Sequence, residues 1–196
     1  LSLTTENATV VYGYDVADAP DITAMVEFTS ENTDTESVTY QWYQIKESSA
    51  EAIKDATTDT YQLNTGLDAG AYTFYCIATA NGYAVASKNV TVTVEKAEAD
   101  GTAPQAEENL SYTGKVQDLV TPGSTSHGVM KYSLMQDGTY TDDIPTGTDA
   151  GTYAVWYKII GDKNHKDSEP ASVKVTIAPM KFSGVVSPSA GVVKKV

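Results

Sequence analysis

Residues 68–76, DAGAYTFYC, return later in the chain as residues 149–157, DAGTYAVWY, at an offset of 81 residues. Four of the first five residues are identical in the two stretches, namely Asp, Ala, Gly and Tyr. The sequences that follow also agree, since VTVTV at 90–94 corresponds to VKVTI at 173–177 and both alternate with the period of a β-strand. The chain therefore contains two tandem units of one design.

The residues after the Asp-Ala-Gly turn alternate as they do in a strand with one buried face. In the first unit this assigns Tyr72, Phe74, Cys76 and Ala78 to the core and Thr73, Tyr75, Ile77 and Thr79 to the opposite face. Similar alternation places Ile22, Ala24, Val26 and Phe28 on one face, and likewise Val38, Tyr40 and Trp42. Turn signals such as Asn81-Gly82 separate the runs, and no segment has a convincing helical period. The sequence predicts an all-β protein.

Length and composition favour two modest domains. The chain has 196 residues, of which 41% are hydrophobic and 20% charged, so each unit can build a core. The segment EKAEADGTAPQAEEN at 95–109 is acidic, contains Pro104 and interrupts the strand alternation, as linkers do. We therefore predict domain 1 at 1–97, domain 2 at 98–179, and residues 180–196 as a tail or the start of a further repeat.

The charge of the chain argues against two classes of partner. The formal net charge is −13, made of −10 in residues 1–97, −6 in 98–179 and +3 in the last 17 residues. Nucleic acids and anionic membrane surfaces both require a positive patch, so we expect neither as a partner. No apolar run reaches the roughly 18 residues of a membrane helix, and we expect no membrane insertion of this segment.

Short strands, frequent turns and roughly 80 to 100 residues per unit are typical of a β-sandwich. The motif Asp-Ala-Gly-Ala-Tyr, with a strand after it and Trp42 two strands earlier, resembles the corner, strand F and strand C of an immunoglobulin-like domain. The resemblance implies that the corner Tyr hydrogen-bonds back upstream. The position of the second disulfide cysteine is Phe74 here and Val155 in the repeat, so we interpret the single cysteine, Cys76, as a small buried hydrophobe.

The second unit resembles the repeated Ig-like modules of large bacterial cell-surface proteins of gut Firmicutes and related bacteria. The stretches that carry the resemblance are YTGKVQDLV at 112–120, DIPTGTDAGTY at 143–153 and YKIIGDKN at 157–164. The likeness spans about 80 residues, and it implies an extracellular stalk or adhesin segment, at the cell surface or secreted. The partners it implies are other modules of the same surface protein and a host protein or glycan.

No catalytic or cofactor motif is present. His127 and His165 lie in polar, turn-rich stretches and are interpreted as solvated loop residues, and the pairs Asp142-Asp143 and Glu107-Glu108 point to opposite faces of an extended chain. We expect no catalytic residue, no cofactor and no metal. A less favoured alternative is Ca²⁺ at the junction, held by oxygen ligands from Glu95, Glu98, Asp100, Glu107 and Glu108, whose spacing matches no calcium loop.

Two aromatic residues are the candidate ligand-binding residues. Tyr75 and Trp156 hold equivalent positions in the two repeats and have the parity of the exposed face. Such a ring can cover a neighbour across the strands, contact a protein or stack on a sugar, and the first of these is favoured. The function expected is a non-enzymatic spacer, stalk or cell-adhesion module. The alternative is a carbohydrate-binding or accessory module of a secreted glycan-degrading enzyme.

Overall fold

The computed structural model describes residues 2–27 and 37–181, and these contain β-strands and no helix. Phe28, predicted to face the core, and residues 182–196 of the tail lie outside the described residues. The chain forms two compact units. Unit 1 comprises residues 1–101, 125–129 and 159–169, and unit 2 comprises residues 102–124, 130–158 and 170–196. The domain boundary predicted between residues 97 and 98 remains a prediction.

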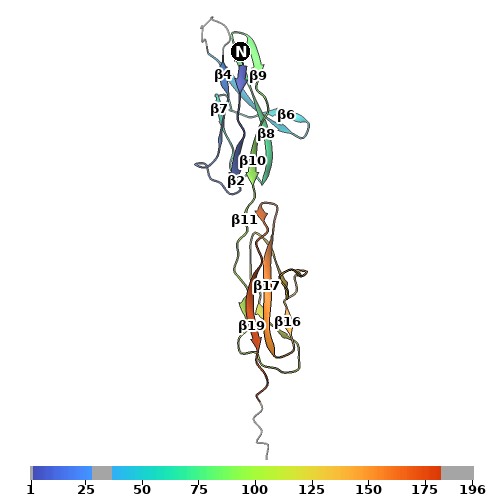
Figure 1. Cartoon of the computed structure of the whole chain (residues 1–196). Helices are drawn as coiled ribbons and strands as arrows, with labels where there is room; N and C mark the ends of the chain where they lie inside the picture. The colour runs from blue at the N-terminus through green and yellow to red at the C-terminus, as the bar shows by residue number, and fades with distance from the viewer. Residues whose placement is uncertain (1, 28–36, 182–196) are drawn as a thin grey trace, which may run out of the picture. The chain divides into compact units, whose positions relative to one another are not determined.

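Unit 1 is a two-layer sandwich. Its main sheet has the order β2 (Ala8–Val11), β10 (Val90–Glu95), β8 (Gly70–Ala80), β5 (Thr39–Lys46) and β6 (Ser49–Ala52), and β9 (Tyr83–Ala86) pairs with the far half of β8. In Figure 1, β10 lies between β2 and β8, its two hydrogen-bonded neighbours. The opposing layer is made of two short pairs, β1 (Ser2–Thr4) with β4 (Met25–Glu27) and β3 (Asp21–Thr23) with β7 (Thr60–Gln62). A further parallel pair joins β11 (Ala97–Glu98) to β18 (His165–Lys166).

The core of unit 1 confirms the faces predicted from alternation. Phe74, Cys76 and Ala78 of β8 are buried, and Trp42 of β5 is paired with Cys76 across the two strands. The indole N–H of Trp42 donates a hydrogen bond of 3.1 Å to the carbonyl of Thr58, so its polar atom is satisfied inside the sandwich. Cys76 is fully buried, as predicted for a small core hydrophobe.

In the alternating run that begins at Ile22, the described residues 21–27 form two strands rather than one. Ile22 lies in β3 and Val26 in β4, and these strands pair with different partners. The break occurs at Ala24, whose N–H donates to the carbonyl of Asp59 at 2.8 Å. Alternation predicted the buried side of this run correctly for Ile22 and Ala24, but it carries no information about where the strand changes partner.

Both copies of the repeated motif form the same corner. The hydroxyl of Tyr72 donates to the carbonyl of Asp68, and the hydroxyl of Tyr153 donates to the carbonyl of Asp149, each at 2.8 Å. This confirms the upstream hydrogen bond that the immunoglobulin-like resemblance implies.

The hairpin after β8 turns at Asn81 (φ 50°) and Gly82 (φ 76°), the left-handed pair that an Asn-Gly turn between strands requires.

In the strand after each corner, one residue exchanges two hydrogen bonds with a serine from a later part of the chain. The N–H of Cys76 donates to Oγ of Ser87 at 2.9 Å, and the N–H of Ser87 donates back to the carbonyl of Cys76 at 2.8 Å. The N–H of Ile159 donates to Oγ of Ser168 at 2.8 Å, and Ser168 returns a 2.9 Å bond to the carbonyl of Ile159. Each serine therefore satisfies two backbone groups at a point where the strand ladder is interrupted.

Unit 2 repeats the sandwich with a three-stranded sheet in place of the six-stranded one. One sheet has the order β15 (Gly128–Ser133), β17 (Gly151–Gly161) and β19 (Ala171–Ile177). The other layer consists of β12 (Gln105–Ala106) with β14 (Val120–Thr121) and β13 (Gln117–Asp118) with β16 (Thr146–Gly147). Its buried hydrophobic residues are Leu119, Val120, Met130, Tyr132, Val155, Val175 and Ile177.

Candidate interaction surface

The outer face of the main sheet in unit 1 is defined by the residues whose side chains point away from the core. The register of the six strands aligns them row by row, while their neighbours Trp42, Phe74 and Val92 are buried. The face has eighteen positions, Thr9 and Val11 from β2, Thr91, Thr93 and Glu95 from β10, Ala71, Thr73, Tyr75, Ile77 and Thr79 from β8, Ala84 and Ala86 from β9, Thr39, Gln41, Tyr43 and Ile45 from β5, and Ala50 and Ala52 from β6.

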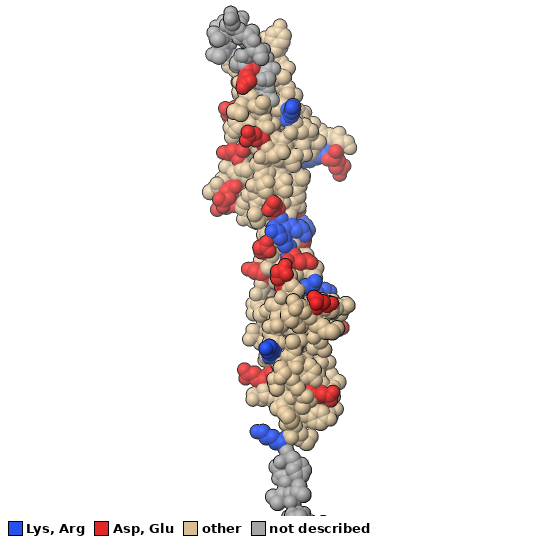
Figure 2. Space-filling view, viewed as in Figure 1, with Lys and Arg blue, Asp and Glu red and all other residues tan. Residues whose placement is uncertain are grey.

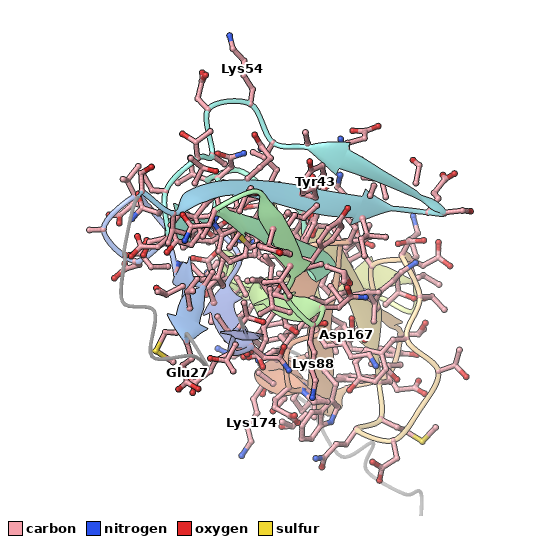
Figure 3. All side chains as sticks on the ribbon, turned by 90° about the horizontal axis from the view of Figure 1, so that it is seen from above. Glu27, Tyr43, Lys54, Lys88, Asp167 and Lys174 are labelled. Carbon is pink, nitrogen blue, oxygen red and sulfur yellow. The ribbon has the colours of Figure 1, made fainter. Side chains whose placement is uncertain are left out.

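This outer face carries almost no charge. Glu95, the last residue of β10, is the one charged residue among the eighteen positions, although 20% of the chain is charged. Charged side chains instead border the face. Lys46 and Glu51 pair at 2.7 Å in the β5–β6 hairpin, and Lys54, which follows this hairpin, projects into solvent in Figure 3. On the side of the molecule shown in Figure 2, uncharged residues separate most of the acidic residues of unit 1.

Two tyrosines stack at the centre of the outer face. Tyr75 of β8 lies directly opposite Tyr43 of β5, with ring centroids 4.9 Å apart and ring planes 7° from parallel. Tyr43 is labelled in Figure 3. Parallel rings at this separation are offset, so part of each ring face remains uncovered. The residue opposite Tyr43 on its other side is Ala52 of β6, which is too small to cover the ring.

Tyr75 therefore has the cross-strand neighbour that the sequence favoured, and the neighbour is Tyr43. Tyr43 directly follows Trp42, so alternation alone places the two side chains on opposite faces of β5 and Tyr43 on the outer one. The pairing of Tyr43 with Tyr75 depends on the register of two strands about 30 residues apart, and no local pattern gives that register.

Trp156, the second candidate residue, lies in unit 2 and has different neighbours. It is half-buried on β17, opposite Ser172 of β19, and Lys174 pairs with the adjacent outward residue, Ala154. Lys158 follows on the same side of β17, with its ammonium 4.8 Å from the ring centroid of Tyr140. The corresponding face of unit 2 therefore carries lysines, whereas the outer face of unit 1 does not.

A polar cluster in unit 1 fixes the loop before β18. Asp68 accepts hydrogen bonds from Nζ of Lys163 at 2.7 Å and from Nδ2 of Asn164 at 2.9 Å, while Oδ1 of Asn164 accepts from the N–H of Ala69 at 2.8 Å. The bonds from Lys163 and Asn164 lower the pKa of the Asp68 carboxyl, and the bond to Asp68 raises the pKa of Lys163. These side chains are occupied in positioning backbone, and the carboxylate and amine remain an ion pair.

The interpretation of His165 as a solvated loop residue is wrong. His165 is buried, its ring packs edge-on against Tyr12 with centroids 5.4 Å apart, and it stacks on His127 with centroids 4.1 Å apart. Its Nδ1 lies 2.8 Å from Oδ1 of Asp162, and this bond is the main cause that lowers the pKa of Asp162. Nδ1 of His127 is 2.6 Å from a carboxylate oxygen of Asp100, without the alignment of a hydrogen bond. Sequence spacing placed no second histidine near either residue, because the two are brought together only by the fold.

Two of the five acidic residues considered as calcium ligands are paired with other side chains. Glu98 pairs with Lys166 at 2.7 Å, a bond that raises the pKa of Lys166, and Glu107 accepts from the hydroxyl of Thr121 at 2.7 Å. Within residues 2–27 and 37–181, no group of three or more His, Cys, Asp or Glu residues is arranged to hold a metal ion. In the same residues, no helix is long and apolar enough to cross a membrane.

Comparisons with known proteins concern the fold. A family model described as "K319L-like, PKD domain" matches residues 15–94. A search of curated proteins finds no match.

Several solved structures of immunoglobulin domains are similar to the chain. One is a chimeric titin Z1Z2 carrying an exogenous peptide from decorin, with 13% identity, a TM-score of 0.31, and coverage of 91% of this chain and 94% of that one. The N-terminal four Ig domains of Dscam1 isoform 7.44 have 10% identity and a TM-score of 0.32, with coverage of 91% of this chain and 51% of that one. Sidekick-1 immunoglobulin domains 1–4 have 12% identity and a TM-score of 0.30, with coverage of 94% of this chain and 47% of that one. The chain is an all-β protein with the immunoglobulin-like β-sandwich fold, and its residues 15–94 match a PKD domain.

Proposed function

We propose that this chain is a non-catalytic extracellular segment of a bacterial surface protein, which spaces its neighbouring modules and contacts another macromolecule through unit 1. Ig-like and PKD domains are commonly extracellular adhesion or spacer modules and are typically non-catalytic. The observation that carries the adhesive part is the outer face of unit 1, which is broad, nearly uncharged and centred on the Tyr43–Tyr75 stack.

The distribution of polar side chains supports a structural role for the rest of the molecule. The corner hydroxyls of Tyr72 and Tyr153 and the side chains of Ser87 and Ser168 all bond to backbone groups. Depletion of charge with enrichment of Tyr is the compositional signature of the centre of a protein interface. The polar groups thus stabilise a scaffold, and the uncharged face is the part offered to a partner.

The proposal is tested by coating beads with the chain and measuring their adhesion to host cells and to one another. Tyr75→Ala beads should adhere several-fold less than wild-type beads. Trp156→Ala beads, altered at the equivalent position of unit 2, are the matched control and should adhere normally. Wild-type beads that adhere to no surface, or equal losses in both variants, would reject an adhesive role for unit 1.

A carbohydrate-binding module is the second candidate, and the partly uncovered rings of Tyr43 and Tyr75 favour it over catalysis. A glycan array with the same two variants separates it from the first. Specific glycan binding that is lost in Tyr75→Ala would replace protein adhesion with carbohydrate recognition. Turnover in a hydrolytic screen would contradict both candidates.

A further inference from the structure

The outer face of unit 1 is large enough to form a specific interface by itself. Across the strands, the face spans four steps of about 4.8 Å between neighbouring strands. Along β8 it spans eight residues of about 3.3 Å each, so its area with the side-chain margins is about 600 Å². Two such faces in contact would bury about 1,200 Å², at the low end of specific protein–protein interfaces. The expected association is weak and depends on concentration.

The charge of the molecule restricts which surface can meet a second copy of the chain. Each copy carries a net charge of −13, so contacts through acidic surfaces bring like charges together. At physiological salt, repulsion between exposed charges extends over a Debye length of about 8 Å. The centre of the outer face holds no carboxylate, and Glu95 lies at the end of β10. Two acidic copies can therefore approach closely there with little repulsion between facing groups.

The face is also suited to pairing with itself. A two-fold interface brings the same patch of each copy together, so the residues at its centre must be able to pack against the same residues of the other copy. Tyr43 and Tyr75 already stack on each other, and each leaves part of a ring face uncovered. The surrounding Thr and Ala side chains are small and uncharged, and they leave room for the rings of the other copy.

We propose that the outer face of unit 1 binds the same face of a second copy of this chain, with the Tyr43–Tyr75 stacks at the centre of the interface. The proposal rests on the adhesive part of the proposed function and names its partner. It places the contact on the outer face of the sheet formed by β2, β10, β8, β5, β6 and β9, and none of it on unit 2.

Sedimentation velocity of the full chain over a concentration series tests the proposal. Wild-type protein should shift from monomer to dimer as concentration rises from about 1 µM to about 1 mM. Added salt should strengthen dimerisation, because it screens repulsion between two acidic copies. A sample that stays monomeric throughout overturns the proposal, and so does a dimer that weakens with salt, because its contacts would be ionic.

Two variants locate the interface. Ala52→Glu places a carboxylate at an exposed position opposite Tyr43, and it should weaken dimerisation at least tenfold without disturbing the core. Thr176→Glu makes the same type of change at an exposed position of β19 in unit 2 and should leave the dimer unchanged. Equal effects of the two changes, or no effect of Ala52→Glu, contradict the proposed surface.

Wild-type protein gives an independent readout that does not depend on the folding of a variant. Amide NMR signals of β8 and β5 should move as the protein is concentrated, while those of β19 should stay fixed. Movement confined to unit 2 overturns the proposal. A chain that stays monomeric while its beads adhere to cells refutes self-association and leaves the adhesive function in place, so the two failures are distinguishable.

Discussion

The hydroxyl of Tyr72 donates a 2.8 Å hydrogen bond to the backbone carbonyl of Asp68, four residues upstream, and this bond fixes the corner at which the chain enters β8. Tyr153 makes the equivalent bond to Asp149 at the same distance. The corner thus has the same geometry in two separate units, and the hydroxyl can be removed in each one independently.

Tyr72→Phe should lower the free energy of unfolding of unit 1 by about 1 kcal/mol, because it removes one net hydrogen bond and keeps the ring. Tyr153→Phe should have a similar effect on unit 2. Chemical denaturation followed by NMR signals of each unit measures the two effects. Tyr83→Phe is the control, since Tyr83 is highly exposed and should change stability by less than about 0.5 kcal/mol. A corner variant as stable as this control would show that the bond contributes nothing.

Ser87→Ala and Ser168→Ala should each cost about 1 to 3 kcal/mol, because each removes the oxygen that accepts a backbone N–H from Cys76 or Ile159. Hydrogen exchange should show faster exchange of these two amides in the respective variant. Ser49→Ala, at an exposed position of β6, provides the control. An unchanged exchange rate at Cys76 in Ser87→Ala would mean that water replaces the hydroxyl without loss.

Alternation and repetition predicted much of this fold because both are local properties. Burial of Phe74, Cys76 and Ala78 followed from the period of β8, and the Tyr corner followed from the repeated motif. Period two gives the face of a strand but not its partner. The division of residues 21–27 into two strands at Ala24 therefore could not be read from the sequence, because it depends on a bond to Asp59, 35 residues away.

The candidate surface was predictable only in part for the same reason. Tyr75 was found by parity, whereas the extent of the nearly uncharged outer face becomes visible only when six strands are placed in register. The burial of His165 depends on contacts with Tyr12 and His127 that come from distant segments. Polar, turn-rich sequence around a histidine is consistent with solvent exposure, and long-range packing overrode that expectation here.

Gly147→Ala should destabilise unit 2 by about 1 to 3 kcal/mol through overpacking. An added Cβ would lie 2.9 Å from Cζ of Tyr153 and 3.1 Å from side-chain carbons of Ile177 and Leu119. Gly151→Ala is the matched control, because a Cβ there meets no atom within 4 Å and its backbone needs no left-handed conformation. Thermal unfolding of the two variants should separate them clearly. Equal midpoints would show that the core around Tyr153 can expand at no cost.

The carboxyl of Asp68 should titrate below its ordinary value of 3.8, because bonds from Lys163 and Asn164 favour its charged form. A group whose pKa is lower in the folded state stabilises that state above its unfolded pKa. This stabilisation is lost as the pH falls below about 3.8 and through the folded pKa. Carbon-detected NMR titration measures the pKa directly. In Lys163→Ala the pKa of Asp68 should rise toward the ordinary value, and an unchanged pKa would exclude Lys163 as its main cause.

The thiol of Cys76 should be inert in the folded protein. Cys76 is fully buried opposite Trp42, and burial raises its pKa from 9.0 to about 11, so at pH 8 about one thiol in a thousand is the reactive thiolate. A disulfide reagent should therefore label wild-type protein only when urea unfolds unit 1. Because the folded pKa is the higher one, the contribution of this thiol to stability is complete below about pH 9 and declines as the pH rises toward about 11. Cys76→Ala removes that decline, and it should cost less stability than Cys76→Ser, which places a hydroxyl among apolar side chains. Rapid labelling of folded wild-type protein would mean that β8 opens locally, and the core of unit 1 would then be less rigid than its packing indicates.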